Sequence, residues 1–295
     1  MTPPPAPTPP VAAPAPARPA SGWEGLLPAG RTAVMGVLNV TPDSFSDGGR
    51  FVDTGAAVAH AARLVAQGAD LLDIGGESTR PGAPEVPEGD EIQRVVPVIT
   101  ALRAAGIDTP ITIDTRKAAV ARAAVQAGAS AVNDVSALRH DPRMAETCAD
   151  LGVPVALMHM RGTPQTMQEA PVYGSVVAEV SAWLEARMDA AVAAGIGRHR
   201  LCVDPGIGFG KTVRHNLLLL KGLNQFTRLG VPLLVGTSRK SFIGTLLEEP
   251  DPARREWGTA ATVTWAVAHG ARIVRVHQVA EMAQVVRLTD AIRSA

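Results

Sequence analysis

Short apolar runs alternate with longer helix-like segments along this chain of 295 residues, and polar residues follow each run. None of the runs alternates apolar with polar positions, as expected of strands that are buried on both faces of a parallel sheet. The eight runs are Thr32–Leu38, Asp70–Ile74, Pro110–Ile113, Ala131–Val132, Val153–Met158, Arg200–Val203, Val231–Val235 and Ala271–Val274. Eight strand–helix units predict an α/β fold, the (β/α)₈ TIM barrel, whose active site is built from loops at the carboxyl ends of the strands.

The segments between the runs are rich in Ala and Leu and have the period and propensity of helices. They are Ala56–Gln67, Glu88–Ala105, Ala118–Ala127, Pro142–Asp150, Ser175–Ala194, Asn216–Arg228, Gly258–Ala268 and Val279–Arg293. Several are followed by a glycine, the residue that most often ends a helix. Since each strand has its own helix, we expect one domain.

The first twenty residues differ in composition from the rest. Residues 1–20 hold nine prolines and a single charge, Arg18, and such a segment buries too little apolar surface to offset its ordering entropy. They predict a disordered Pro/Ala-rich tail that lacks the features of a secretory signal. Residues 21–295 then form a single TIM-barrel catalytic domain, near the roughly 250 residues typical of this fold.

Charge and apolar content exclude several classes of partner. Lys+Arg and Asp+Glu balance at 28 each and aromatic residues make up 3%, which argues against nucleic acid. No run approaches the roughly 20 apolar residues that span a membrane. The two cysteines, Cys148 and Cys202, do not indicate a disulfide framework, so we expect a cytoplasmic protein.

The chain uses Arg for nearly all of its positive charges. Its 28 basic residues include only four lysines: Lys117, Lys211, Lys221 and Lys240. A retained lysine is therefore expected where a compact ammonium group matters, and Lys240 directly follows Arg239.

Two long polar segments follow the first two runs. Leu38–Gly49 and Gly75–Ala83 are long for strand-to-helix loops and rich in turn-forming residues, which suits mobile lids as well as ordinary surface loops. Arg80, beside a serine and a threonine, can hold an anion. Asn39 offers a neutral oxygen to Mg²⁺, which takes its other ligands from water and substrate phosphates.

Asp114, Asn133 and Asp204 hold equivalent positions at the ends of three strands. Each could cap the helix that follows it, but three such side chains at one barrel mouth favour ligand binding. Asp204 opens the segment Asp204–Lys211, which departs from both a P-loop and a dinucleotide fingerprint. Its glycines are expected to permit tight turns, and its carboxylate to accept the paired donors of a guanidine-like ring edge.

Basic residues follow the last two runs. Ser238, Arg239 and Lys240 come after the seventh run, and Arg275 and His277 end the eighth. The corresponding loops of TIM barrels commonly bind phosphate. A cluster of basic residues with no function is the alternative.

The fifth run ends at Met158 and His159. Met158 is expected to pack in the core or to line the floor of a pocket. His159 lacks a second ligand at the spacing of a zinc site, so we assign no zinc. No Ser–His or Cys–His pair of a nucleophilic enzyme is evident.

Seven motifs, in this order, resemble those of the bacterial dihydropteroate synthases. They are Leu38–Gly49, Gly75–Ala83, Val132–Asp134, Leu157–Gly162, Asp204–Lys211, Ser238–Phe242 and Arg275–His277. The resemblance implies a cytoplasmic TIM-barrel homodimer, a transferase of folate biosynthesis and a sulfonamide target. Enzymes of this family use Mg²⁺ and join 6-hydroxymethyl-7,8-dihydropterin diphosphate to p-aminobenzoate, with release of diphosphate.

The resemblance also implies roles for individual residues. The pterin is bound by Asp114, Asn133, Asp204 and Lys240, with Met158 and Phe209 beside its ring. The diphosphate is bound by Thr79, Arg80, Arg275 and His277, and its Mg²⁺ contacts Asn39. The p-aminobenzoate site is bordered by Phe45, Pro81 and Ser238, while Asp43 and Asp47 belong to the closing first loop. The residues expected to take part in catalysis are Lys240, Arg80, Asp47, Arg275 and His277.

Two positions, Arg116 and Gln278, depart from the usual residues of that family and are interpreted as background variation. The chemistry that the resemblance implies suits the remaining residues. An electron-rich dihydropterin can share the cation left on its methylene group, which favours an SN1-like displacement. The aniline nitrogen then needs no strong enzyme base.

Three other functions fit part of the pattern. A related pterin-binding barrel passes a methyl group from methyltetrahydrofolate to a corrinoid protein, but has no use for Arg80 and Arg275. A Schiff-base aldolase would use Lys240, and a non-catalytic paralogue would only bind a pterin or a partner. Sulfonamide susceptibility depends on fine geometry around the p-aminobenzoate site, which the sequence does not show.

Overall fold

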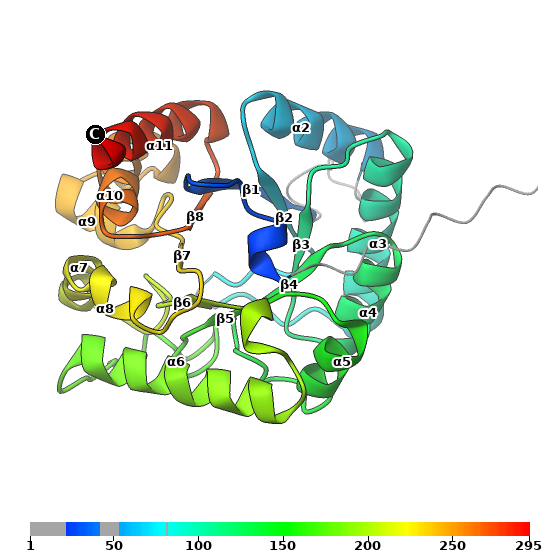
Figure 1. Cartoon of the computed structure of the whole chain (residues 1–295), viewed down its shortest axis with the longest axis horizontal. Coiled ribbons are helices and arrows are strands. Elements are labelled where there is room, and N and C mark those ends of the chain that lie inside the picture. Colours follow the sequence, from blue (N-terminus) through cyan, green and yellow to red (C-terminus); the bar gives the residue numbers. More distant parts are fainter. Residues whose placement is uncertain (1–21, 42–52, 81) are drawn as a thin grey trace, which may run out of the picture.

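The computed structural model describes residues 22–41, 53–80 and 82–295. Its strands are β1 Ala33–Asn39, β2 Leu71–Gly75, β3 Ile111–Asp114, β4 Ala131–Asp134, β5 Val155–Met158, β6 Leu201–Asp204, β7 Leu234–Val235 and β8 Ile273–Val276. They pair in parallel in the order β6-β5-β4-β3-β2-β1-β8-β7. A parallel bridge between Val203 and Leu233 links the two ends of this sheet, so the TIM barrel is confirmed (Figure 1). The predicted tail, residues 1–20, lies outside the described residues.

The helices surround the ring of strands (Figure 1). They are α2 Thr54–Ala66, α3 Glu88–Ala104, α4 Ala118–Gln126, α5 Met144–Leu151, α6 Val176–Ala193, α7 Val213–Lys221, α8 Leu223–Thr227, α9 Ser241–Leu247, α10 Glu256–Ala268 and α11 Val279–Ser294, with short 3₁₀ turns η1 Trp23–Gly25, η2 Arg198–Arg200 and η3 Pro252–Arg254. None of the helices in the described part of the chain is long and apolar enough to cross a membrane.

One predicted helix is wrong as a single element. Residues 216–228 form parts of α7 and α8, which meet at Gly222. Helix α7 also begins earlier than predicted, because Thr212 accepts a hydrogen bond from the backbone of His215 and the His215 ring accepts one in return. Such reciprocal capping fixes a helix start that hydrophobic periodicity alone does not mark.

Alternate residues along the strands belong to two separate apolar clusters. Leu72, Val132 and Val203 pack outward in the cluster that the helices cover. Leu71, Ala131 and Cys202 face inward and join the cluster inside the barrel. Because side chains alternate between the faces of a strand, this division fixes which polar residues of the same strands point into the barrel.

The amino-terminal end of the barrel is closed by Trp23. Its ring is fully buried in the interior cluster, and its Nε1 donates to the carbonyl oxygen of Val155 at 3.2 Å. Figure 1 shows η1, in blue, across the centre of the ring of strands. This end is therefore apolar, and the open end of the barrel lies at the carboxyl ends of the strands.

Candidate active site

The barrel interior becomes polar two residues beyond the apolar layer, toward the carboxyl ends of the strands. Asp73, Asn133, Asp204 and Arg275 follow the inward-facing Leu71, Ala131, Cys202 and Ile273 of the apolar layer. Asp114 ends β3 in register with Asn133 on β4 and with Gly75 on β2. The barrel thus brings four predicted ligand residues, together with Asp73, into one layer at its mouth.

Asp73 lies at the centre of this layer, although the sequence analysis assigned it no role. Its carboxylate accepts hydrogen bonds from Arg275 Nε at 2.5 Å, from Asn133 Nδ2 at 3.2 Å and from the hydroxyl of Thr112. Arg275 Nη2 donates to Asp114 at 3.0 Å. The available signal was a carboxylate within the apolar run of β2, two residues before the strand's end.

Two carboxylates share one guanidinium in this layer, and this affects their protonation. Burial raises the pKa of Asp114 to about 7, the charge of Asp73 adds to the rise, and Arg275 opposes it. Burial by itself would lower the pKa of Arg275, but the two aspartates outweigh it and hold that pKa above its ordinary value. Arg275 therefore stays charged, while Asp114 exchanges its proton near neutral pH.

A second acid–base pair lies across the mouth. Burial raises the pKa of Asp204 to about 6, against the hydrogen bond from the Gly206 amide and the charge of Lys240. Burial lowers the pKa of Lys240 to about 8, with Asp204 opposing the change. The Lys240 Nζ lies 3.9 Å from the centre of the Phe209 ring. This cation–π contact holds the ammonium beside an apolar face.

The loop after β6 makes two turns that only glycine allows. Gly206 has a φ of +66° and Gly208 of +83°, and a Cβ on Gly206 would lie 1.9 Å from the carbonyl oxygen of His159. Between these turns the amide of Gly206 donates to Asp204 at 2.7 Å. The prediction that these glycines permit tight turns is confirmed.

Lys211 also fixes the loop after β6. Its Nζ donates to the carbonyl oxygen of Phe209 at 2.8 Å and lies 3.0 Å from His159 Nδ1. Burial lowers the pKa of His159 to about 3 and that of Lys211 to about 7. The imidazole is therefore neutral at physiological pH and accepts a hydrogen bond from the lysine.

Ser238 and His277 form a hydrogen-bonded pair that the sequence analysis did not anticipate. The Ser238 Oγ lies 3.0 Å from His277 Nδ1 and accepts a bond from the His277 amide at 3.2 Å. Burial, together with the charges of Arg275, Arg239, Lys240 and Arg80, lowers the pKa of His277 to about 3. So weak a base does not activate a serine at neutral pH. The convergence of four cations on one imidazole instead indicates an anion site.

The remaining predicted residues are only partly described by the structure. Met158 is buried in an apolar cluster against which Phe209 packs. Asn39 and Thr79 are half-buried and Arg80 is exposed. The described residues hold no group of three or more His, Cys, Asp or Glu side chains that could bind a metal. Asp43, Phe45, Asp47 and Pro81 lie outside the described residues.

Both departures from the family pattern have side-chain partners. Arg116 Nη2 lies 2.8 Å from Glu77 Oε1 in an ion pair, and Gln278 donates to Glu256. A buried guanidinium needs such a partner, so Arg116 is part of the packing at the mouth. Its interpretation as background variation is not supported by this position.

The chain matches known proteins over most of its length. Residues 35–277 match the family described as pterin binding enzyme. A dihydropteroate synthase of Synechocystis sp. is 50% identical over 262 residues, which cover 89% of this chain and 90% of that protein. Dihydropteroate synthase from Xanthomonas albilineans in complex with 7,8-dihydropteroate has a TM-score of 0.81 and 47% identity, and the match covers 90% of this chain and 95% of that one. The Yersinia pestis enzyme, in a sulfonamide drug complex, has a TM-score of 0.86 and 45% identity, with coverage of 91% and 97%.

We predict that Asp73→Asn destabilises the fold by about 3 kcal/mol, because it leaves the half-buried Arg275 guanidinium with less compensating charge. Since the charge of Asp73 also raises the pKa of Asp114, that pKa should fall from about 7 toward its ordinary value. Urea denaturation measures the first effect and carboxyl NMR titration the second. The control is Asp150→Asn, which breaks an ion pair between Asp150 and Arg122 whose side chains are 61% and 44% exposed. It should lower the free energy of unfolding by less than about 1 kcal/mol. Equal losses from both substitutions would contradict the central role of Asp73.

Proposed function

The chain belongs to the pterin-binding enzyme family, and we propose that it catalyses the dihydropteroate synthase reaction of folate biosynthesis. It is a transferase that joins p-aminobenzoate to 6-hydroxymethyl-7,8-dihydropterin diphosphate and releases diphosphate. The observation that carries this proposal is the layer at the barrel mouth, where Asp114, Asn133 and Asp204 face the same space as Arg275 and Lys240. Carboxylate and amide groups suit the donor edge of a pterin, and the cations suit a diphosphate.

The pterin ring is expected to lie across the strand ends. Asp204 accepts from the amino and ring N–H groups along one edge, and Asn133 supplies both a donor and an acceptor. Lys240 donates to the ring carbonyl as a point charge. Phe209, against which the Lys240 ammonium rests, covers one face of the ring. Asp204 and Asn133 stand on strands, Phe209 on the loop fixed by Lys211, and Lys240 at the start of α9, so these groups need little rearrangement when substrate binds.

The leaving group is expected at the cationic side of the mouth. Arg275 is already fixed by Asp73 and Asp114, and its charge stabilises the oxygen that departs with the electron pair. His277 is neutral and bonded through Nδ1 to Ser238, so its Nε2 is left to face the phosphate. Thr79 and Arg80 approach the same group from the loop after β2. The p-aminobenzoate nitrogen then attacks the methylene carbon and loses its proton to solvent, without a strong enzyme base.

We also propose that Mg²⁺ accompanies the diphosphate. Asn39 ends β1 beside Gly75 of β2 and is half-buried, and no described group of acidic or imidazole side chains competes for the ion. One amide oxygen together with phosphate and water oxygens fits the ligand preference of this ion. Bound there, it would neutralise charge that develops on the leaving diphosphate. Phe45, Pro81 and Ser238 remain the proposed border of the p-aminobenzoate site.

The rival functions find less support. Methyl transfer to a corrinoid protein leaves the four cations around His277 without a substrate group to bind. A Schiff-base aldolase would use Lys240, whose ammonium instead rests against the Phe209 ring. A non-catalytic paralogue has no physical reason to keep these buried charges, because each costs desolvation energy.

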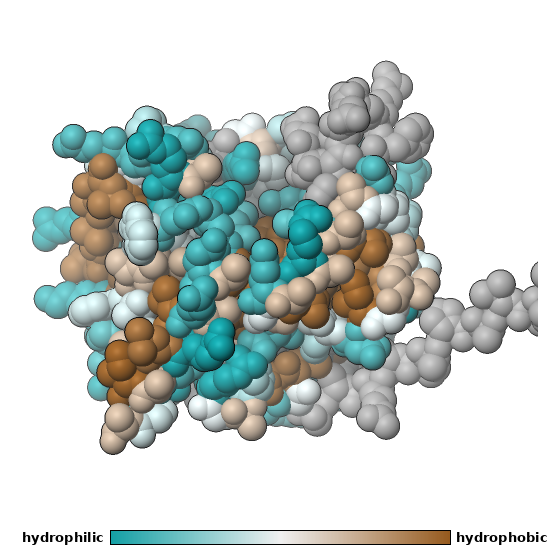
Figure 2. Space-filling model, turned by 90° about the horizontal axis from the view of Figure 1, so that it is seen from above, coloured by the Kyte–Doolittle hydropathy of each residue, from teal (hydrophilic) through white to brown (hydrophobic). Residues whose placement is uncertain are grey.

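Two further properties are proposed from the surface and from the cysteines. Helices α7, α9, α10 and α11 expose large apolar side chains on one side of the barrel: Leu217, Leu218, Leu246, Leu247, Trp257, Trp265, Leu288 and Ile292. Figure 2 shows hydrophobic residues gathered at the end of the molecule where α9 lies. Such a patch indicates an interface, and we propose a homodimer. Cys148 and Cys202 are both free thiols, which suits a cytoplasmic location.

The proposed reaction is tested by diphosphate release. We expect Mg²⁺-dependent release that requires both the pterin diphosphate and p-aminobenzoate, and its loss on chelation of the metal. Lys240→Ala should weaken pterin binding and lower kcat/KM by about a hundredfold, which corresponds to about 2.7 kcal/mol of lost transition-state stabilisation. Release that proceeds without p-aminobenzoate would contradict the proposal, as would Lys240→Ala turnover close to that of the parent chain.

The pH dependence of kcat/KM is predicted to be bell-shaped. Asp204 and Asp114 accept hydrogen bonds with both carboxylate oxygens only when ionised, so activity falls as the pH drops through their pKa values of about 6 and about 7. Lys240 must be an ammonium, so activity falls again as the pH rises through its pKa of about 8. In Lys240→Arg the cation persists to much higher pH, and the alkaline limb should move upward. An alkaline limb unchanged in that variant would assign it to another group.

The proposed dimer is tested at Trp257, whose side chain is 86% exposed on α10. Trp257→Glu places a charge where an apolar contact is expected, and the desolvation cost should shift the protein toward monomers. Analytical ultracentrifugation measures the equilibrium. Val172→Glu changes a residue that is 70% exposed on the loop before α6 and should leave it unchanged. A monomeric parent chain at micromolar concentration would refute the dimer.

A further inference from the structure

The loop between β2 and α3 carries Thr79 and Arg80, and within the described part of the chain neither side chain makes a hydrogen bond or an ion pair. Arg80 is exposed, and its amide donates to Ser78 at the long distance of 3.4 Å. The positions of the Thr79 and Arg80 side chains therefore depend on the conformation of the loop backbone. The described part of the loop, residues 76–80 and 82–87, contains one buried acidic side chain, Glu77.

Glu77 takes part in a buried ion-pair cluster with Arg116, Lys117 and Glu91. Its Oε1 lies 2.8 Å from Arg116 Nη2, and its Oε2 lies 2.8 Å from Lys117 Nζ. Lys117 Nζ also reaches Glu91 Oε2 at 2.6 Å. The Glu77 side chain is 5% exposed. Two carboxylates thus face two cations where solvent hardly reaches, which balances the charge of the cluster.

The protonation states follow from this balance. Burial by itself would raise the pKa of Glu77, but the hydrogen bond from Lys117 and the charge of Arg116 outweigh it and lower the pKa below its ordinary value. Burial lowers the pKa of Lys117 less than its bonds to Glu77 and Glu91 raise it. Both groups are therefore charged at neutral pH, and the interaction between them is a true ion pair.

The same carboxylate connects the two ends of the loop. Oε1 of Glu77, near the start of the loop, accepts a hydrogen bond from the amide of Val86, near its end, at 3.3 Å. Next to it, Arg94 on α3 donates to the carbonyl oxygen of Gly76 at 2.8 Å. A Cβ on Gly76 would lie 2.8 Å from the Val95 side chain, so the loop begins pressed against α3. Thr79 and Arg80 follow this fixed point by two and three residues.

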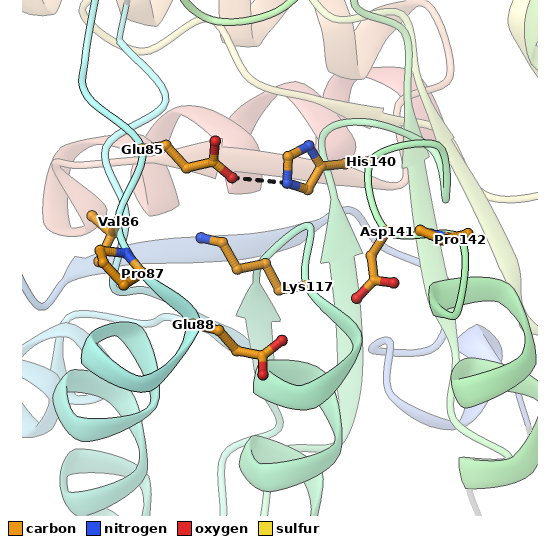
Figure 3. Close-up of a pocket in the computed structure, with 8 residues that line it drawn as sticks. All are labelled: Glu85, Val86, Pro87, Glu88, Lys117, His140, Asp141 and Pro142. Atoms are coloured by element: carbon orange, nitrogen blue, oxygen red, sulfur yellow. Dashed lines mark ion pairs between the residues drawn. The ribbon is translucent and has the colours of Figure 1, made fainter.

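A cleft of about 530 Å³ lies beside the cluster, next to the end of the loop (Figure 3). It is lined by Glu85, Val86, Pro87, Glu88, Lys117, His140, Asp141 and Pro142. Across it, only a solvent-exposed contact joins the two walls in Figure 3, between Glu85 and His140 at 3.0 Å. Exposed pairs of this kind contribute little, whereas a buried pair with ideal geometry fixes its partners strongly.

We propose that Glu77, held by Arg116 and Lys117, is a positioning residue that sets where Thr79 and Arg80 stand relative to the departing diphosphate. Glu77 itself touches neither substrate. The inference rests on the proposed function, because it concerns the leaving group of that reaction. It also gives Arg116 a function in this chain, as the second of the two cations that orient the Glu77 carboxylate.

Glu77→Gln tests the inference, because it keeps the shape of the side chain and removes its charge. We expect KM for the pterin diphosphate and Kd for inorganic diphosphate to rise roughly tenfold, as expected of a small misplacement of the binding loop. Kd for 6-hydroxymethylpterin, which lacks the diphosphate, should stay within about twofold, because its ligands stand on β3, β4 and β6. A merely structural role for Glu77 would weaken the binding of both ligands or of neither.

The matched control is Glu85→Gln, which makes the same change on the same loop at the exposed pair and should alter none of these constants. If Glu77→Gln does not fold, Arg116→Ser decides: it keeps Lys117 bonded to both carboxylates, removes the second cation that holds Glu77, and should still raise KM for the pterin diphosphate severalfold without weakening pterin binding. Unchanged diphosphate affinity in both variants, or an equal loss of pterin affinity, would overturn the inference. Absence of diphosphate release by the parent chain would instead count against the proposed function.

Discussion

The contact between Asp73 and Arg275 constrains the whole mouth of the barrel. A carboxylate with no exposed surface is stable only when paired and fully hydrogen-bonded, and Asp73 meets this need with Arg275, Asn133 and Thr112. These bonds fix the direction of the Asn133 amide and leave one edge of the Arg275 guanidinium for Asp114. The ligand residues are consequently held in place before any substrate arrives, which reduces the reorganisation that binding requires.

The position of this charged layer depends on the apolar layer beneath it. Trp23 and the inward-facing residues of the strands close the amino-terminal end of the barrel. Water therefore reaches the charges from one side only, and electrostatic interactions there are stronger than in bulk solvent. The same burial shifts the pKa values of Asp114 and Asp204 up and that of Lys240 down, toward neutrality. The site can keep both signs of charge while remaining responsive to pH in the physiological range.

The sequence predicted the barrel, most helices and the residues that end its strands, because periodicity and position along a strand are local properties. It did not reveal Asp73, whose main partner is 202 residues away in the chain, nor the pairing of Ser238 with His277. Both depend on which strands become neighbours and on their register, and hydrophobic patterning does not encode either. The break between α7 and α8 was missed for a related reason: one glycine inside a helical pattern does not by itself mark a helix end.

The surroundings of the four lysines bear on the expectation that a retained lysine marks a place where a compact ammonium group matters. Lys117 is held between Glu77 and Glu91, and Lys211 between His159 and the carbonyl of Phe209. In each case a single nitrogen receives partners from different directions, which a tetrahedral ammonium satisfies and a planar guanidinium fork does not. Lys240, stacked on Phe209, completes the set, whereas Lys221 is exposed at the end of α7 and fits no such requirement. One buried lysine therefore supports the loop after β2 and another the loop after β6. Three of the four lysines thus stand where a compact ammonium group is needed, whereas arginine serves where charge alone suffices or where two parallel bonds are made.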